Sequence, residues 1–280
     1  MPIRLVAIDL DGTLLNSDSE ISQANRQALM AAAERGVQLI VVTGRRFHSA
    51  RPIVQRLPCP VTLISSNGAL IGSSSGDEFV RRNFLPHAIA RQVLEIAREY
   101  RPYAVAIFDV PTRGQIVMQE GAVPEGPLGW YLQKSPEFLA LVPDLKAAVI
   151  SDPVHLMFGG PPSHMAPLEP LLLASSAGHD VHMTWTKYFT RNMSILDVMN
   201  KGCSKGGALK WWAERCGIHP SEVMAIGDNY NDIEMLQFSG QPVVMGNCTP
   251  GLGADGWPVT LSNDQDGVAA ALHTYVLSKT

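Results

Sequence analysis

Two pairs of aspartates lie directly after apolar, β-branched runs of this sequence. Asp9 and Asp11 follow a run near the N-terminus, and Asp228 and Asp232 follow another near the C-terminus. Carboxylates two residues apart at the end of a strand point the same way if the strand continues, and crowded like charges are unfavourable unless a cation or protons compensate them. Such a surplus of hard oxygen ligands suits Mg²⁺. The four aspartates therefore predict a magnesium site.

A carboxylate beside a divalent cation can also act as a nucleophile. With one oxygen of Asp9 held by the metal, the other oxygen could attack phosphorus, and aspartyl-phosphates are established intermediates for carboxylate nucleophiles. Asp11 could then protonate the leaving alcohol and later activate a water molecule. These two residues therefore predict phosphoryl transfer through Asp9.

Phosphoryl transfer needs further groups that stabilise the negative charge on the equatorial oxygens of the phosphoryl group. Thr43 offers a hydroxyl, and the backbone at Gly44 offers N–H groups beside it. Arg45 could place its guanidinium fork on phosphate oxygens. Lys205 offers a point charge at the start of a predicted helix, a position that itself favours phosphate. These four residues are the expected phosphate-binding groups.

These side chains need strands and helices that bring them together. Apolar runs typical of strands buried on both faces occupy residues 3–8, 37–42 and 61–64. A helix is predicted over 22–35, with Ser22 as its N-cap and Gly36 just past its end, and another over 47–57. The alternation returns near the C-terminus, with predicted strands at 195–199, 223–226 and 242–245 and predicted helices at 205–216, 231–238 and 267–277.

Strands that alternate with helices predict right-handed crossovers and a parallel sheet. Such sheets bind ligands at the carboxyl ends of their strands, which is where the candidate residues fall. The middle of the chain differs, because residues 85–188 mix helix-like with strand-like stretches separated by turn signals. We therefore expect an α/β fold, with a Rossmann-like parallel-sheet core of residues 1–84 and 189–280 and an α+β module of residues 85–188 inserted into it.

Composition excludes several other classes of protein. The chain has 280 residues, 46% of them hydrophobic and 17% charged, with a formal net charge of −4. This is enough for a sizeable core and does not indicate disorder or a nucleic-acid partner. There is no apolar run long enough for a membrane span, and the four cysteines have no CxxC spacing. A cytoplasmic protein that does not bind membranes is expected.

The motifs together resemble those of a known family. The segments DLDGTLL (9–15), VVTGR (41–45), KGCSKGGAL (201–209) and GDNYND (227–232) occur in the order of the four motifs of the haloacid dehalogenase-like superfamily. Within it the chain resembles the Cof-type phosphatases, and the resemblance extends over nearly the whole chain. It implies a Rossmann-like core with an inserted α+β cap of the larger, C2 type, which sets substrate specificity.

The resemblance also implies a role for each aspartate. Asp9 would be the nucleophile and Asp11 the acid and base. Asp9, the backbone carbonyl of Asp11, and Asp228 would hold Mg²⁺, and Asp232 would support the metal through water.

For the phosphoryl group, the resemblance implies binding by Thr43 and Lys205, with Asn231 hydrogen-bonded near the phosphate or near Lys205. Two lysines compete for the third-motif role, and we choose Lys205 over Lys201 because KGxAL opening a helix is the family pattern. Cys203 stands where a valine is common.

The leading function is hydrolysis of small phosphorylated metabolites, such as sugar phosphates or phosphorylated cofactors. A phosphomutase or other phosphotransferase would use the same motifs. A catalytically idle binding protein on this fold is a further alternative, and a dehalogenase fits less well because its chemistry needs neither Asp11 nor the metal cluster. The substrate and the oligomeric state stay open.

Overall fold

The computed structural model describes residues 2–74, 76, 78–122, 129, 135–188, 192–252 and 256–278. The chain forms two compact units. We call Met1–Arg82 together with Ser204–Thr280 the core unit, and Asn83–Cys203 the inserted unit. Every predicted site residue belongs to the core unit, so the description of the site concerns that unit alone.

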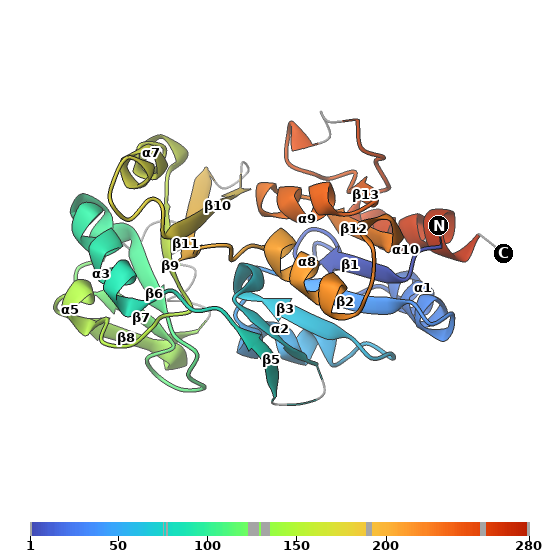
Figure 1. Cartoon of the computed structure of the whole chain (residues 1–280), viewed down its shortest axis with the longest axis horizontal. Coiled ribbons are helices and arrows are strands. Elements are labelled where there is room, and N and C mark those ends of the chain that lie inside the picture. Colours follow the sequence, from blue (N-terminus) through green and yellow to red (C-terminus); the bar gives the residue numbers. More distant parts are fainter. Residues whose placement is uncertain are drawn as a thin grey trace. The chain divides into compact units, whose positions relative to one another are not determined.

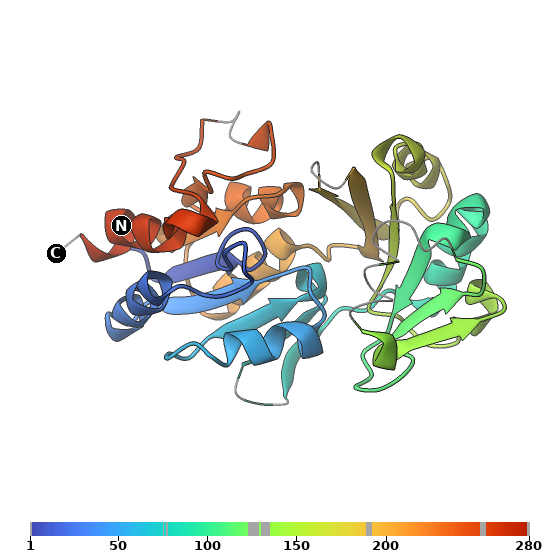
Figure 2. The ribbon, with the colours of Figure 1, turned by 180° about the vertical axis from the view of Figure 1, so that it is seen from behind.

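The core unit is built on a seven-stranded sheet (Figures 1 and 2). Its strands, in spatial order, are β13 (Gln241–Val244), β12 (Val223–Gly227), β1 (Leu5–Asp9), β2 (Gln38–Val42), β3 (Thr62–Ser65), β4 (Leu70–Ser73) and β5 (Phe79–Arg82). The first five are parallel, and β4 and β5 add an antiparallel hairpin. The predicted α/β class with a Rossmann-like parallel sheet is confirmed.

Helices cover both faces of this sheet. The helices are α1 (Gln23–Glu34), α2 (Phe47–Val54), α8 (Lys205–Arg215), α9 (Ile233–Phe238) and α10 (Gly267–Leu272), the last continued by a π-turn over His273–Leu277. The apolar sides of α8 and α9 pack on β1, β2 and β12, on the face turned to the viewer in Figure 1. Helices α1, α2 and α10 lie over the opposite face, which Figure 2 shows.

The local signals that predicted α1 are present in the structure. The Ser22 hydroxyl accepts a hydrogen bond from the N–H of Asn25 and so caps the first turn. Gly36 follows the helix with a φ of +79°, the left-handed conformation that ends many helices. The second predicted helix is shorter than expected: α2 ends at Val54 and not at residue 57, and it contains Pro52.

The inserted unit contains a six-stranded sheet. Its strands, in spatial order, are β10 (Val181–Tyr188), β11 (Met193–Asn200), β9 (His155–Gly160), β6 (Ala104–Ile107), β7 (Ile116–Gln119) and β8 (Leu139–Val142). All pairs are antiparallel except β7 with β8. Its helices are α3 (His87–Ile96), α5 (Leu145–Ala148), α6 (Pro162–Met165) and α7 (Leu168–Leu173), which pack on one face of the sheet. This is an α+β arrangement.

One predicted strand lies in a different sheet from the one expected. We assigned 195–199 to the parallel core, yet it forms β11, which pairs antiparallel with β9 and β10 in the inserted unit. The compact units accordingly divide after Arg82 and after Cys203, not at 84/85 and 188/189. The reason is that a buried apolar strand has the same pattern in either sheet, and only its pairing partners distinguish them.

Among the described residues, the structure contains no helix that could cross a membrane. All four cysteines are in the thiol form, without a disulfide; Cys203 is buried and the other three are partly exposed.

Candidate active site

Three neighbouring strands of the core sheet end beside one another, and each leads into a predicted site residue. Asp9 is the last residue of β1, Thr43 follows β2, and Asp228 follows β12. Because β12, β1 and β2 are adjacent and parallel, their carboxyl ends share one edge of the sheet. The sheet therefore brings these three residues together.

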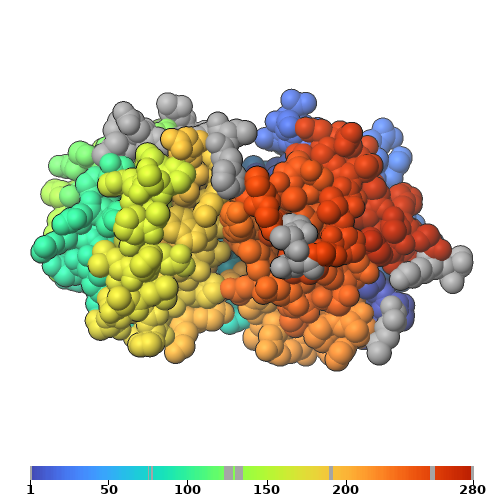
Figure 3. All heavy atoms as spheres, turned by 90° about the horizontal axis from the view of Figure 1, so that it is seen from above, coloured from blue at the N-terminus to red at the C-terminus, as the bar shows by residue number. Residues whose placement is uncertain are grey.

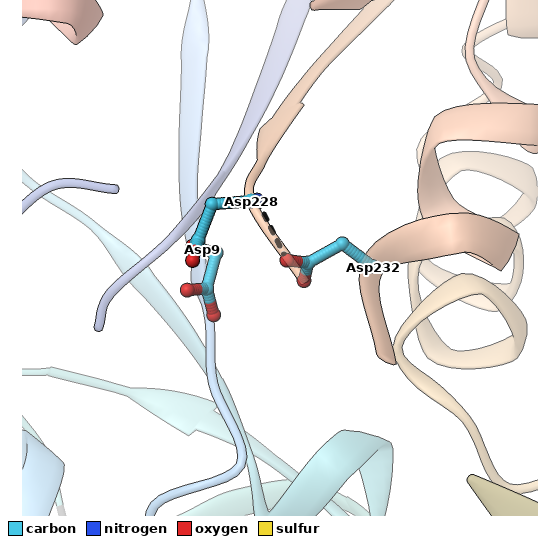
Figure 4. Close-up of side chains that lie close together, drawn as sticks. All are labelled: Asp9, Asp228 and Asp232. Carbon is cyan, nitrogen blue, oxygen red and sulfur yellow. Dashed lines mark hydrogen bonds between the residues drawn. The ribbon is translucent and has the colours of Figure 1, made fainter. Parts of the chain in front are cut away.

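The aspartates form a buried cluster (Figure 4). One carboxylate oxygen from each of Asp9, Asp228 and Asp232 lies within 4.8 Å of the others. The exposed fractions of these residues are 4%, 8% and 0%. Bulk water therefore screens their mutual repulsion poorly.

Lys205 bridges two members of this cluster. It is the first residue of α8, whose N-cap Ser204 accepts a hydrogen bond from the N–H of Gly207. Its Nζ donates to Asp9 Oδ1 and to Asp232 Oδ1, both at 2.6 Å. Only 2% of Lys205 is exposed. The cap thus fixes where the helix starts, and the helix start places the ammonium between Asp9 and Asp232.

Asp232 accepts hydrogen bonds through both of its carboxylate oxygens. Its Oδ1 accepts from Lys205, and its Oδ2 accepts from the backbone N–H groups of Asp228 and Asn229 at 3.0 Å each. Both oxygens are therefore engaged by protein donors. This favours a role in holding Lys205 and the loop after β12, and the water-mediated support of a metal stays a prediction.

Burial and charge shift the pKa values of the cluster. Burial raises the pKa of Asp9 well above its usual value; the Lys205 charge opposes this, and the neighbouring carboxylates add to it. Burial also raises the pKa of Asp228 to about 7, with the charge of Asp232 adding to the effect and the hydrogen bond from Thr13 opposing it. Burial alone would lower the pKa of Lys205, but the charges of Asp232 and Asp9 outweigh it and raise that pKa.

The donor set fits a hard divalent cation. Three ionised carboxylates against one ammonium would leave an excess of negative charge in a buried site, which protons or a cation must compensate. The side chains of Asp9 and Asp228 would hold Mg²⁺, in keeping with its preference for one or two carboxylates plus water and phosphate oxygens.

We expect Mg²⁺ to bind more tightly as pH rises, because the raised pKa of Asp228 means that a proton competes with the metal below about pH 7. Apparent affinity should fall by up to about tenfold per pH unit below that value. Calorimetric titration of Mg²⁺ from about pH 6 to about pH 8 in two buffers of different ionisation enthalpy would also count the proton released. Asp228→Asn removes a proposed ligand and should weaken Mg²⁺ binding at every pH, whereas Asp18→Asn, which changes an exposed aspartate, is the control and should keep the wild-type pH dependence. A constant affinity across the range would contradict the assignment.

Thr13 is a site residue that the sequence analysis missed. It is fully buried, and its hydroxyl donates to Asp228 Oδ1 at 2.7 Å. The neighbouring Gly12 has a φ of +83°, and a Cβ there would lie 2.5 Å from Asp228 Oδ2, so only glycine lets the loop approach the carboxylate. The signal was available, since Thr13 belongs to the first motif.

Arg45 contacts Asp11 in this structure. Its Nε donates to Asp11 Oδ2 at 2.8 Å and its Nη2 to Asp11 Oδ1 at 2.5 Å. Both side chains are partly exposed. A two-point contact fixes the orientation of the carboxylate. The predicted role of Arg45 in phosphate binding is untested, and the observed contact favours positioning of Asp11 instead.

Thr43 belongs to the loop after β2 and Asn231 to the loop after β12, and each side chain forms a hydrogen bond within the site. Thr43 is buried, and its hydroxyl accepts from the N–H of Arg45 at 3.1 Å. Asn231 donates from Nδ2 to Asn67 Oδ1 at 3.1 Å. Asn67 is buried, has a φ of +51°, and lies 3.2 Å from the position of a Cβ at Gly44. The turn after β3 therefore contacts the loops after β2 and β12 through Asn67.

Comparisons with known proteins extend over nearly the whole chain. A model of the haloacid dehalogenase-like hydrolase family matches residues 6–272. An HMP-PP phosphatase of Serratia proteamaculans is 31% identical over 89% of this chain and 86% of its own. The pyridoxal phosphate phosphatase YbhA of Escherichia coli is 26% identical over 99% and 100%. The crystal structure of a haloacid dehalogenase-like hydrolase from Bacteroides thetaiotaomicron, 26% identical, covers 97% of this chain and 99% of its own with a TM-score of 0.76.

Proposed function

This chain belongs to the haloacid dehalogenase-like hydrolase family, and on that premise we propose that it hydrolyses small phosphate esters through an aspartyl-phosphate on Asp9, with Mg²⁺ as cofactor. The predicted enzyme class, a phosphatase of this family, is confirmed by the family match and by relatives that are themselves named phosphatases. Two of these relatives are named for HMP-PP and for pyridoxal phosphate. We propose sugar phosphates and phosphorylated cofactors as the substrate range.

The observation that carries the mechanism is the contact of Lys205 with Asp9. The ammonium holds Oδ1 of Asp9 at 2.6 Å in a site from which water is largely excluded. A fixed cation at this place both orients the nucleophile and stabilises negative charge that develops on the phosphoryl oxygens. Bound Mg²⁺ would supply further positive charge there.

In the first step, a carboxylate oxygen of Asp9 attacks phosphorus and the bond from phosphorus to the leaving oxygen breaks. Asp11 gives its proton to that leaving oxygen. Thr43 and Lys205 bind the equatorial oxygens. The product is an acyl phosphate on Asp9 and a free alcohol.

In the second step, the Asp11 carboxylate takes a proton from water as the water oxygen attacks phosphorus. The bond between phosphorus and the Asp9 oxygen breaks, inorganic phosphate leaves, and both aspartates return to their starting states. Arg45, which holds both oxygens of Asp11, would keep this carboxyl oriented in both steps.

The test is phosphate release from p-nitrophenyl phosphate and from a panel of sugar phosphates and phosphorylated cofactors, with Mg²⁺ and with EDTA. Release that EDTA stops and Mg²⁺ restores supports the proposal, and the panel ranks the leaving groups. Full activity in exhaustively chelated protein would remove the metal from the mechanism. Transfer of the phosphoryl group to a second sugar, without release of phosphate, would support a phosphomutase instead.

For Asp11→Asn, we expect turnover to fall by about 10²- to 10⁴-fold because the acid and base is lost. Mg²⁺ affinity should stay within about threefold, since only the backbone carbonyl of Asp11 is a proposed ligand. Phosphate release and Mg²⁺ calorimetry measure the two effects. The loss should be smaller for p-nitrophenyl phosphate, whose leaving group needs little protonation. Loss of metal binding in this variant would contradict the role assigned to Asp11.

For Arg45→Met, we expect kcat to fall by about tenfold with little change in KM, because the Asp11 carboxyl loses its two-point contact. Arg45→Lys keeps the charge but not the fork, so it should recover only part of the rate. Steady-state kinetics together with inhibition by inorganic phosphate separate the two roles. A raised KM and weaker phosphate inhibition with unchanged kcat would establish the phosphate-binding role instead.

A further inference from the structure

A cavity of about 320 Å³ opens in the inserted unit between helices α6 and α7 and the paired strands β10 and β11. Its volume is at the lower end of the range for small-molecule sites, roughly 300–1,000 Å³. The segments that border it lie side by side at the surface of this unit, where α7 is yellow and the two strands are gold in Figure 3. The described lining residues all belong to the inserted unit, and none is a predicted catalytic or metal-binding residue.

Strand geometry places three chemically different groups on one wall of this cavity. Trp185 and Lys187 are two residues apart on β10 and so share a face of the sheet. Ser194 of β11 is the register partner of Lys187, and directly opposed residues project to the same side. An indole, an ammonium and a hydroxyl therefore line the cavity together.

The Ser194 hydroxyl has no hydrogen-bond partner among the described residues, although only 1% of Ser194 is exposed. A buried polar group without a partner is unfavourable, and most such groups in folded proteins are paired. A ligand that donates to or accepts from this hydroxyl would satisfy it. The unpaired hydroxyl in a cavity wall is thus an independent sign of an occupant.

The charges limit what that occupant can be. Glu169 accepts a hydrogen bond from Trp185 Nε1 at 2.6 Å, which fixes the indole ring. The Nζ of Lys187 lies 5.9 Å from the centroid of the same ring. Among the described lining residues the charged groups are the ammonium of Lys187 and the carboxylate of Glu169, a pair that suits a singly charged anion better than a phosphate dianion, which Glu169 would repel more strongly. The indole, with Met193 and Ala166 around it, provides apolar surface for a planar ring.

We propose that this cavity is a binding site for a small aromatic monocarboxylate. The carboxylate pairs with Lys187, the ring lies against Trp185, and the Ser194 hydroxyl supplies a further hydrogen bond. The proposal does not depend on the identity of the phosphatase substrate.

The test is calorimetric titration of the full chain with indole-3-acetate and, as its uncharged match, indole-3-acetamide. A ligand of this size should bind wild type with a Kd of about 1 mM, and the amide should bind at least about tenfold more weakly. Lys187→Met should weaken indole-3-acetate binding by about tenfold or more. Lys146→Met, which removes another lysine of the inserted unit that is not part of the cavity lining, is the matched control and should bind as wild type does.

Ser194→Ala supplies a second readout. It should weaken indole-3-acetate binding by about fivefold, yet unfold at the same or a higher temperature than wild type, because it removes an unpaired buried hydroxyl. No binding to wild type at about 10 mM ligand, equal binding of the acid and the amide, or equal binding to wild type and Lys187→Met would each overturn the proposal. Unchanged binding by Ser194→Ala would overturn the part assigned to the hydroxyl.

Discussion

Asp9→Asn should reduce phosphate release by at least about 10³-fold, because the amide cannot form the acyl phosphate that the proposed mechanism requires. The fold should survive, since asparagine has the shape of aspartate and Lys205 keeps its contact with Asp232. Turnover under saturating substrate and Mg²⁺ gives the rate, and thermal unfolding shows whether the fold is intact. Asp18→Asn, which changes an exposed aspartate of the same N-terminal region, should behave as wild type.

Mass spectrometry separates the loss of a nucleophile from a general disturbance of the site. Wild-type enzyme that is acid-quenched during turnover should carry one phosphoryl group on the peptide that contains Asp9. Asp9→Asn should carry none. A folded and fully active Asp9→Asn variant, or a phosphoryl group on another residue, would contradict the proposed mechanism.

Lys205→Met should both destabilise the core unit and stop turnover. It removes a buried ammonium whose Nζ lies 2.6 Å from Asp9 and from Asp232, and so leaves those carboxylates facing each other without compensation. Breaking a buried ion pair by deleting one partner costs about 3–5 kcal/mol. The loss of the phosphate contact should lower kcat by about 10²- to 10³-fold. Urea unfolding and steady-state kinetics measure these two losses.

Lys201→Met is the matched control, because Lys201 lies in the same sequence motif but is exposed and belongs to the inserted unit. It should have wild-type stability and turnover. Mg²⁺ should restore part of the stability of Lys205→Met, since a bound cation compensates the same carboxylates. If Lys205→Met does not fold, Lys205→Arg is a milder substitution, since it keeps the positive charge, and its stability and turnover can be measured instead. Wild-type stability and activity in Lys205→Met would contradict the role we assign to Lys205.

Short-range rules made much of the site predictable from the sequence. The end of a buried strand placed Asp9, Thr43 and Asp228 at one edge of a parallel sheet, because ligand sites on such sheets follow the carboxyl ends of strands. The spacing of the third motif correctly placed Lys205 at the first position of a helix, which Ser204 caps. These features depend on residues within a few positions of one another.

Other features depend on contacts between distant parts of the chain. The sheet to which the strand at 195–199 belongs was predicted wrongly, because its apolar pattern is the same in either unit. The contact of Thr13 with Asp228 joins residues 215 positions apart. The contact of Arg45 with Asp11 and that of Asn231 with Asn67 likewise join separate loops.

The sequence by itself determined the family, the α/β class and the candidate residues for phosphoryl transfer, because motif order and strand-end spacing are local properties. Only the tertiary structure decided which groups those residues contact, namely Lys205 between Asp9 and Asp232 and Arg45 on Asp11. It also decided that the Ser194 hydroxyl, beside a cavity of the inserted unit, has no hydrogen-bond partner among the described residues. The physical reason is that burial and pairing depend on how elements far apart in the chain pack together, and no local pattern records that packing.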